Sequence, residues 1–172
     1  MSVVVYIMRH GIAADPTPGM SDADRALTAE GVRKTERAAV GLQRIGVKPD
    51  VILSSPLRRA EETARLVADV LKPNASIELF PPLAGGLAVE DVVKGLRPHR
   101  QARELLLVGH QPDLGQLASY LLTGSANLAP LPFKKAGVAA IELSSVPPRS
   151  AGLLQWFLTP SQLRDIASSR NS

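Results

Sequence analysis

The residues of this chain that are best suited to chemistry are histidines and arginines that follow apolar segments. Arg9 and His10 end the apolar run "VVVYIM", and His110 ends the run "ELLLVG". Arg58 and Arg59 stand just beyond a third apolar run, in "DVILSSPLRRAEETA". The chain has three histidines, and two of them occupy equivalent positions. Three segments therefore end in groups that a purely structural turn does not need.

Guanidinium and imidazole groups gathered in one cleft suit a phosphoryl group. Arginine donates two parallel hydrogen bonds to phosphate oxygens, and a neutral imidazole can attack phosphorus or donate to a phosphoryl oxygen. Neighbouring guanidinium charges disfavour the imidazolium form, so a histidine among them stays neutral near pH 7. Because no carboxylate belongs to this set, we predict neither a metal ion nor another cofactor.

The two consecutive arginines have two interpretations. Arg58 and Arg59 fall in the first turn of a predicted helix, where each cation opposes the helix dipole by about 0.3–1 kcal/mol. An anion bound in front of that turn would reverse the sign of this effect. Alternatively, the arginines pair with Glu61 or Glu62 on the surface, and we expect this of one of the two.

The elements that must position these residues alternate between strand and helix patterns. Residues 3–8 predict a strand, a loop follows through about residue 27, and residues 28–44 predict a helix. The apolar face of that helix consists of Val32, Ala39, Leu42 and Ile45. Ser55 is predicted to cap a second helix, with Pro56 as its first helical residue. Further strands are predicted at 50–55, 76–80, 104–110, 137–143 and 152–158, and further helices at 89–96, after Pro112 and from the capping box "TPSQ".

This alternation predicts an α/β fold, a three-layer α/β/α sandwich with a mostly parallel central sheet, in a single domain over residues 1–172. The last two strands, separated by "SVPPRSA", are expected to be antiparallel and to lie near one side of the sheet. Ligands bind at the carboxyl ends of the strands in such sheets, so we expect the three junctions to form one cleft. Gly11 is expected to let the backbone turn away directly after His10.

Composition excludes several other classes of function. The net charge is +4 and the sequence pI about 9.8, but aromatic residues make up only 3%, so base-stacking surfaces are scarce and no nucleic-acid partner is predicted. The absence of cysteine excludes disulfides, thiolate metal sites and a cysteine nucleophile. No apolar run approaches the roughly 18 residues of a membrane span, and the start does not resemble a signal peptide, so we expect no membrane association and a cytoplasmic location.

The residues also resemble a known family. Arg9-His10-Gly11, "SSPLRRAEETA" and "VGHQP", in this order and spacing, resemble the RHG motif and companion segments of the histidine phosphatase superfamily, the phosphoglycerate mutase-like clan. "RALTAEG" at 25–31 and the S-P-x-x-R-A-x-x-T form of residues 55–63 resemble its SixA-type branch, the phosphohistidine phosphatases. The resemblance covers nearly the whole chain and implies the same α/β/α sandwich, with the pocket over the strand ends.

The resemblance implies a role for each matching residue. His10 is similar to the nucleophile that becomes transiently phosphorylated, and Arg9 and Arg59 are similar to the phosphate clamps. Arg59 rather than Arg58 precedes the matching alanine. His110 is similar to the second histidine, which stabilises the charge of the phosphoryl group during transfer, before water hydrolyses the phosphoenzyme.

The sequence departs from the family at one position. Many members have a glutamate in an L-x-E segment that protonates the leaving oxygen, whereas Gly85 stands at this place in "PPLAGGLAVE". A phosphoramidate nitrogen departs more readily than an alkoxide, so the loss favours the SixA-type branch. Asp15, Glu90 and Asp113 are candidate replacement acids, although each also fits a carboxylate in a turn or at a helix start.

These residues predict a metal-independent phosphatase that acts through phosphorylated His10. The predicted substrate is a phosphohistidine-bearing protein domain, with a role in signal transduction. Two alternatives stay open: a phosphatase of small phosphorylated metabolites, and a phosphate- or phosphoprotein-binding module with little turnover. His99, in "LRPHRQAR", is expected to lie on a solvated basic loop without a function.

Overall fold

A six-stranded mixed sheet forms the centre of the protein, in a computed structural model that describes residues 2–71 and 76–169. The strands lie in the order β3-β2-β4-β1-β5-β6. Four neighbouring strands run parallel, and β5 and β6 run antiparallel at one side, as predicted. The strands are β1 (Val3–Arg9), β2 (Val51–Ser54), β3 (Ser76–Leu79), β4 (Glu104–Gly109), β5 (Val138–Leu143) and β6 (Leu153–Leu158).

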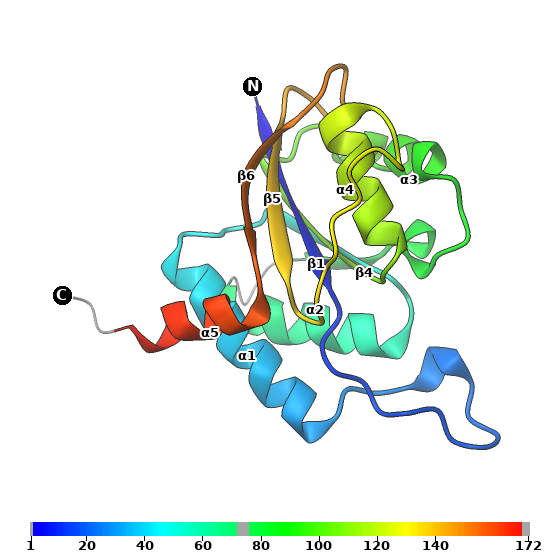
Figure 1. Ribbon diagram of the computed structural model, residues 1–172, viewed down its shortest axis with the longest axis vertical. Helices are drawn as coiled ribbons and strands as arrows, with labels where there is room; N and C mark the ends of the chain where they lie inside the picture. The colour runs from blue at the N-terminus through cyan, green and yellow to red at the C-terminus, as the bar shows by residue number, and fades with distance from the viewer. Residues whose placement is uncertain (1, 72–75, 170–172) are drawn as a thin grey trace.

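Helices cover both faces of this sheet, which confirms the predicted three-layer sandwich (Figure 1). One face carries α1 (Ala29–Arg44), α2 (Arg58–Leu71) and α5 (Pro160–Ser168). The other face carries α3 (Val89–Gly95) and α4 (Asp113–Thr123). Short 3-10 helices form at Asp22–Asp24, Pro81–Ala84 and Arg97–His99. No helix in the described ranges is long and apolar enough to cross a membrane.

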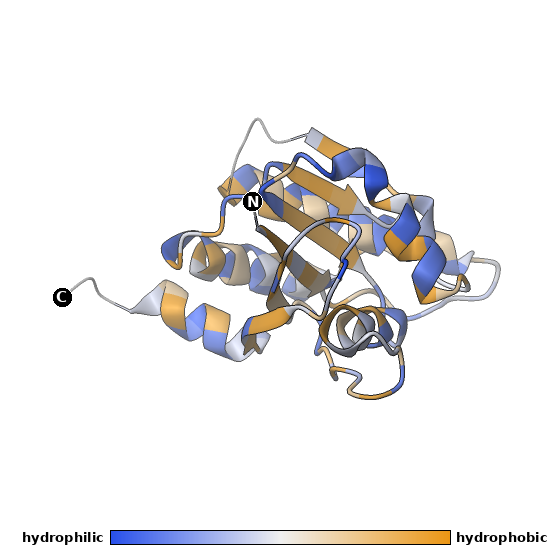
Figure 2. Cartoon of the chain, turned by 90° about the horizontal axis from the view of Figure 1, so that it is seen from above, coloured by the Kyte–Doolittle hydropathy of each residue, from blue (hydrophilic) through white to orange (hydrophobic). Residues whose placement is uncertain are grey.

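The strands are apolar on both sides because each side packs against helices. In β1, Val5 and Ile7 belong to the core under α3 and α4, whereas Tyr6 and Met8 belong to the core under α1 and α2. Successive side chains of a strand point to opposite faces, so a strand buried on both faces requires a continuous apolar run. Figure 2 shows the same arrangement, with hydrophobic strands between helices of mixed hydropathy.

The strand order brings the three predicted junctions together. β4 lies between β2 and β1, and all three run parallel. In register, Arg9 is opposite Gly109, and Ser54 is opposite Val108. The carboxyl ends of the strands that precede His10, Ser55 and His110 therefore meet at one edge of the sheet.

Two local predictions need correction. α2 begins at Arg58 rather than at Pro56, because Ser55 accepts a hydrogen bond from Leu57 N (3.2 Å) and the chain bends before the helix starts. Ile45 lies beyond α1 and is 40% exposed. The buried face of α1 instead consists mainly of small residues, which allows close packing: Gly31, Thr35, Ala38, Ala39, Gly41 and Leu42. By contrast, the capping box and first-turn proline of α5 are confirmed.

Candidate active site

The two histidines lie side by side at the carboxyl ends of β1 and β4. His10 follows β1 directly, and its backbone N donates to Gly109 O at 3.0 Å, which holds it against the end of β4. His110 follows β4, and the centroids of the two imidazole rings are 5.1 Å apart. Both residues are buried, at 6% and 8% exposure. The structure therefore brings together the two histidines that were predicted from separate junctions.

The hydrogen bond of His10 determines which of its nitrogens can react. His10 Nδ1 lies 2.7 Å from Gly11 O, and a carbonyl oxygen can only accept, so Nδ1 carries the proton. Nε2 is then the nitrogen with the free electron pair. Burial, together with the positive charges of His110, Arg59 and Arg9, lowers the pKa of His10 to about 3, against the opposing effect of the Gly11 carbonyl. His10 is therefore a neutral imidazole near pH 7, with a free electron pair on Nε2.

His110 is held by a serine that the sequence indicated only as a helix cap. His110 Nε2 lies 2.7 Å from Ser55 Oγ, and this oxygen already accepts from Leu57 N at 3.2 Å. A hydroxyl can donate while it accepts, and if that of Ser55 donates to Nε2, the ring proton of His110 is on Nδ1. Burial and the charge of Arg59 lower the pKa of His110 to about 4. The position of Ser55, first after β2, was the sequence signal that could have indicated this contact.

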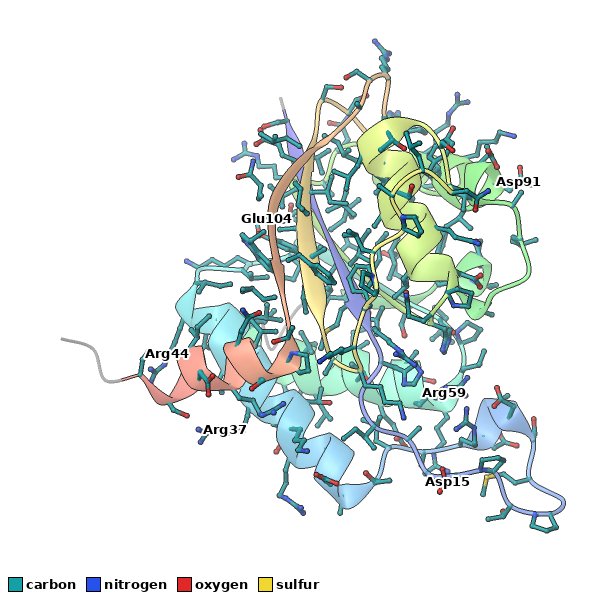
Figure 3. The ribbon with its side chains drawn as sticks, in the orientation of Figure 1. Asp15, Arg37, Arg44, Arg59, Asp91 and Glu104 are labelled. Carbon is teal, nitrogen blue, oxygen red and sulfur yellow. The ribbon has the colours of Figure 1, made fainter. Side chains whose placement is uncertain are left out.

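The two consecutive arginines are separated by the start of α2. Arg58 is exposed, and its Nε forms an ion pair with Glu62 Oε1 at 2.8 Å. Arg59 is 6% exposed and donates from one NH group to Asp22 O (2.8 Å) and from the other to Asp22 Oδ2 (3.0 Å). Figure 3 shows Arg59 between the strand ends and the loop that carries Asp15. The expected surface pairing applies to Arg58, whereas Arg59 lies beside the histidines.

Sequence reasoning missed Asp22. This residue also accepts from Arg25 Nε at 2.9 Å, and its hydrogen bonds to Arg25 and Arg59 lower the pKa of its carboxyl. Asp22 lies in a 3-10 turn within the long loop after β1, where no periodicity indicates which side chains face the strands. Its structural effect is to fix the orientation of the Arg59 guanidinium.

Three unpartnered nitrogens belong to the residues whose charges act on His10, namely Arg9, Arg59 and His110. Arg9 NH1 donates to Phe133 O at 2.9 Å, but Arg9 Nε is buried without a hydrogen-bond partner. The same holds for Arg59 Nε and His110 Nδ1, and the one other such side-chain atom in the described ranges is Thr35 Oγ1. Leaving a buried donor unpaired costs about 1–3 kcal/mol, so each one needs an explanation. An oxyanion in front of His10 is a ligand that can accept from all three.

The absence of a side chain at Gly11 is required by the tight packing around it, not by its backbone dihedral angles. Gly11 is not among the glycines with positive φ, so the change of chain direction after His10 does not require a glycine for its backbone angles. A Cβ at Gly11 would collide with Thr35 Oγ1 and lie 3.3 Å from Leu27 Cδ2. Gly11 N also donates to Thr63 Oγ1 at 3.0 Å, which ties the residue after His10 to α2.

The three candidate acids lie in different surroundings. Asp15 is exposed on the loop after β1 (Figure 3), and Glu90 is exposed on α3. Asp113 is half-buried at the start of α4, and a Cβ at Gly85 would lie 2.7 Å from its Oδ2. Asp113 is thus the one of these three whose carboxylate occupies the space beside the glycine. A proton-donating role for it stays a prediction.

The remaining histidine and the possibility of a metal site were also considered in the sequence. His99 is not on a fully solvated loop as expected, because its side chain is 14% exposed and its Nε2 lies 3.6 Å from Glu78 Oε2. Within residues 2–71 and 76–169, no three His, Cys, Asp or Glu side chains cluster closely enough to hold a metal ion.

Comparison with known proteins gives the class to which this geometry belongs. The model of the histidine phosphatase superfamily (branch 1) matches residues 5–84. The chain is 29% identical over 162 residues to the phosphohistidine phosphatase SixA of Escherichia coli K12, covering 93% of this chain and 96% of that protein. It is 38% identical over 140 residues to an uncharacterized protein of Picosynechococcus, covering 80% and 83% of the two chains.

Solved structures agree with these relatives. The structure of the protein histidine phosphatase SixA complexed with tungstate matches with a TM-score of 0.82 and 30% identity, covering 94% of this chain and 99% of that one. A phosphoglycerate mutase from Bacillus anthracis matches with a TM-score of 0.68 and 17% identity, covering 98% and 97%, and shares the fold. The chain belongs to the histidine phosphatase superfamily. Within it, this phosphatase is of the SixA type, which confirms the resemblance seen in the sequence.

Proposed function

We propose that this protein is a phosphohistidine phosphatase that removes the phosphoryl group from a histidine of a protein domain through phosphorylated His10, without a metal ion. One observation carries the proposal. The three residues whose charges act on His10 each keep a buried nitrogen without a partner (Arg9 Nε, Arg59 Nε and His110 Nδ1), and the Nε2 of His10 has a free electron pair. The tungstate bound by the related SixA is itself an oxyanion, which supports the same kind of ligand here.

In the first step, His10 Nε2 forms a bond to phosphorus as the phosphorus–nitrogen bond of the substrate breaks. The bonding electron pair stays on the substrate imidazole, which departs as a neutral ring when its other nitrogen is protonated. His10 keeps its proton on Nδ1 and gains positive charge as it becomes phosphorylated. The hydrogen bond from Nδ1 to Gly11 O stabilises that charge.

The surrounding donors stabilise charge on the transferring group. Hydrogen bonds from Arg9, Arg59 and His110 to the phosphoryl oxygens are preorganised, because backbone and side-chain contacts already hold all three residues. Each such donor typically contributes about 10²–10³ in kcat. In the second step, water attacks the phosphorus of phospho-His10, inorganic phosphate leaves, and Nε2 recovers its electron pair.

The leaving group distinguishes phosphohistidine from phosphate esters. Gly85 supplies no acid, and its φ of +103° disfavours any other residue there. An ester needs a proton on its leaving oxygen, whereas a protonated imidazole leaves without help from the enzyme. The site therefore supports a phosphoramidate substrate better than an ester.

The test compares substrates and one variant. A histidine-containing domain, phosphorylated chemically with phosphoramidate, should lose its phosphate in the presence of the wild type and keep it with His10→Ala. A panel of sugar and nucleotide phosphates should react much more slowly. Faster turnover of the esters would establish the metabolite phosphatase instead, and binding without turnover would establish the binding module.

A further inference from the structure

A second cleft lies directly beside the proposed phosphoryl site and shares one residue with it. It has a volume of about 330 Å³ and lies between α1, the start of α5 and the turn before β5. Figure 1 shows the start of β5 close to the end of β6 from which α5 continues, with α1 alongside α5. The charged residues that line it are Arg9, Lys34, Lys134, Lys135 and Arg164, which we call the basic cleft.

The basic cleft carries uncompensated positive charge. No Asp or Glu is among the residues that line it. Lys34 is paired with Glu30 at 2.5 Å, but Lys134, Lys135 and Arg164 form no ion pair with any residue in the described part of the chain. Lys134 and Lys135 are also exposed. The two lysines are therefore available to an acidic ligand, and Arg164, whose charge acts on Glu30 without an ion pair, adds to the positive potential.

The turn with the two lysines is fixed to the residues of the phosphoryl site. Arg9 N donates to Gly137 O (3.2 Å), and Arg9 NH1 donates to Phe133 O (2.9 Å). Ala136 N donates to both Arg9 O (3.0 Å) and His10 O (3.1 Å). These bonds bracket the lysine pair on both sides. The backbone positions of the two lysines relative to His10 are thus set before any ligand arrives.

We propose that the basic cleft is a docking site for acidic side chains on the protein that carries the phosphohistidine. This rests on the proposed function and names a feature of its substrate: carboxylates next to the phosphorylated histidine. The charges are spread over α1, a turn and α5. A spread of this kind fits several carboxylates of a protein surface better than one additional phosphate of a small molecule.

The test removes the lysine pair and compares two substrates. Lys134→Gln/Lys135→Gln is assayed with a phosphorylated histidine-containing domain that has acidic side chains beside its histidine, and with inorganic phosphoramidate. We expect kcat/KM for the domain to fall about 5- to 30-fold through KM, with a weaker dependence on salt, while kcat and the rate with phosphoramidate stay unchanged.

A matched control removes two charges from the other end of the sheet. Arg97→Gln/Arg100→Gln changes the net charge equally, and both arginines are exposed just before β4 begins. This control should behave as the wild type with both substrates. An equal loss in the control, an unchanged KM in the lysine variant, or an equal loss with phosphoramidate would overturn the docking site.

Two more outcomes separate the alternatives. If a metabolite with two phosphate groups lost the same factor as the domain, the cleft would be a small-molecule subsite and the proposal would be wrong. If the wild type hydrolysed neither the domain nor phosphoramidate, the proposed function itself would fail. If the wild type hydrolysed both the domain and phosphoramidate, but the lysine variant had an unchanged KM for the domain, only the docking proposal would be wrong.

Discussion

Replacing Ser55 with alanine should weaken catalysis although this residue need not touch the substrate. Its hydroxyl lies 2.7 Å from His110 Nε2, and by donating to this nitrogen it would keep the ring proton on Nδ1, which has no hydrogen-bond partner in the described part of the chain. Without the hydroxyl, a buried nitrogen loses its partner and the second tautomer becomes accessible. Such a loss costs about 1–3 kcal/mol, which corresponds to a roughly 5- to 150-fold lower kcat/KM.

The assay measures kcat/KM with phosphoramidate and the tautomer of His110 by nitrogen NMR. Ser54→Ala is the matched control, because Ser54 is equally buried but donates to Ser55 O at 2.9 Å rather than to a histidine. Ser55 also accepts from Leu57 N, so the free energy of unfolding should be measured for both variants. A Ser55→Ala protein with wild-type kcat/KM and an unchanged tautomer would refute this reasoning, as would an equal loss in Ser54→Ala.

Three further results are expected. The two site histidines have pKa values of about 3 and about 4, below the value of about 6.5 in an unfolded chain, so the unfolded state binds more protons as the pH falls from 6.5 towards 4. In urea unfolding, the free energy of unfolding should therefore decrease over this range by up to about 1.4 kcal/mol per pH unit for each histidine. A His10→Ala variant should show a shallower decrease. Parallel curves for the variant and the wild type would contradict a buried, neutral His10 ring. Gly11→Ala should lower the free energy of unfolding by about 1–3 kcal/mol through its collision with Thr35 Oγ1, and Thr35→Ala should restore part of it; a neutral Gly11→Ala would contradict the packing. Gly85→Glu should not create esterase activity, because of the φ of +103° and the nearby Asp113 carboxylate; rapid ester turnover by this variant would show that the backbone accommodates the acid.

The features that could be predicted from the sequence are those in which local pattern and burial agree. The runs of β1 and β4 are buried on both faces, and the capping residues of α5 act within one turn. The approach of His10 and His110 was predictable because each follows a parallel strand, and parallel strands end at the same edge. The direction of the strands predicts the shared edge, and the adjacency of β1 and β4 then brings the two rings into contact.

The remaining features depend on which elements are neighbours, and a local pattern does not contain that information. Ser55 contacts His110 because β2 lies next to β4, although 55 residues separate the two in the chain. Asp22 reaches Arg59 from a loop without periodicity. The requirement for Gly11 comes from the close approach of Thr35 on α1, not from a turn.

The most direct test of the central claim is to trap the phosphoenzyme. The wild type is mixed with a phosphorylated histidine-containing domain, quenched within milliseconds under alkaline conditions, and analysed by mass spectrometry and phosphorus NMR. We predict one phosphoryl group on Nε2 of His10, because Nδ1 is committed to Gly11 O. Hydrolysis without covalent phosphate, or phosphate on another residue or on Nδ1, would contradict the mechanism.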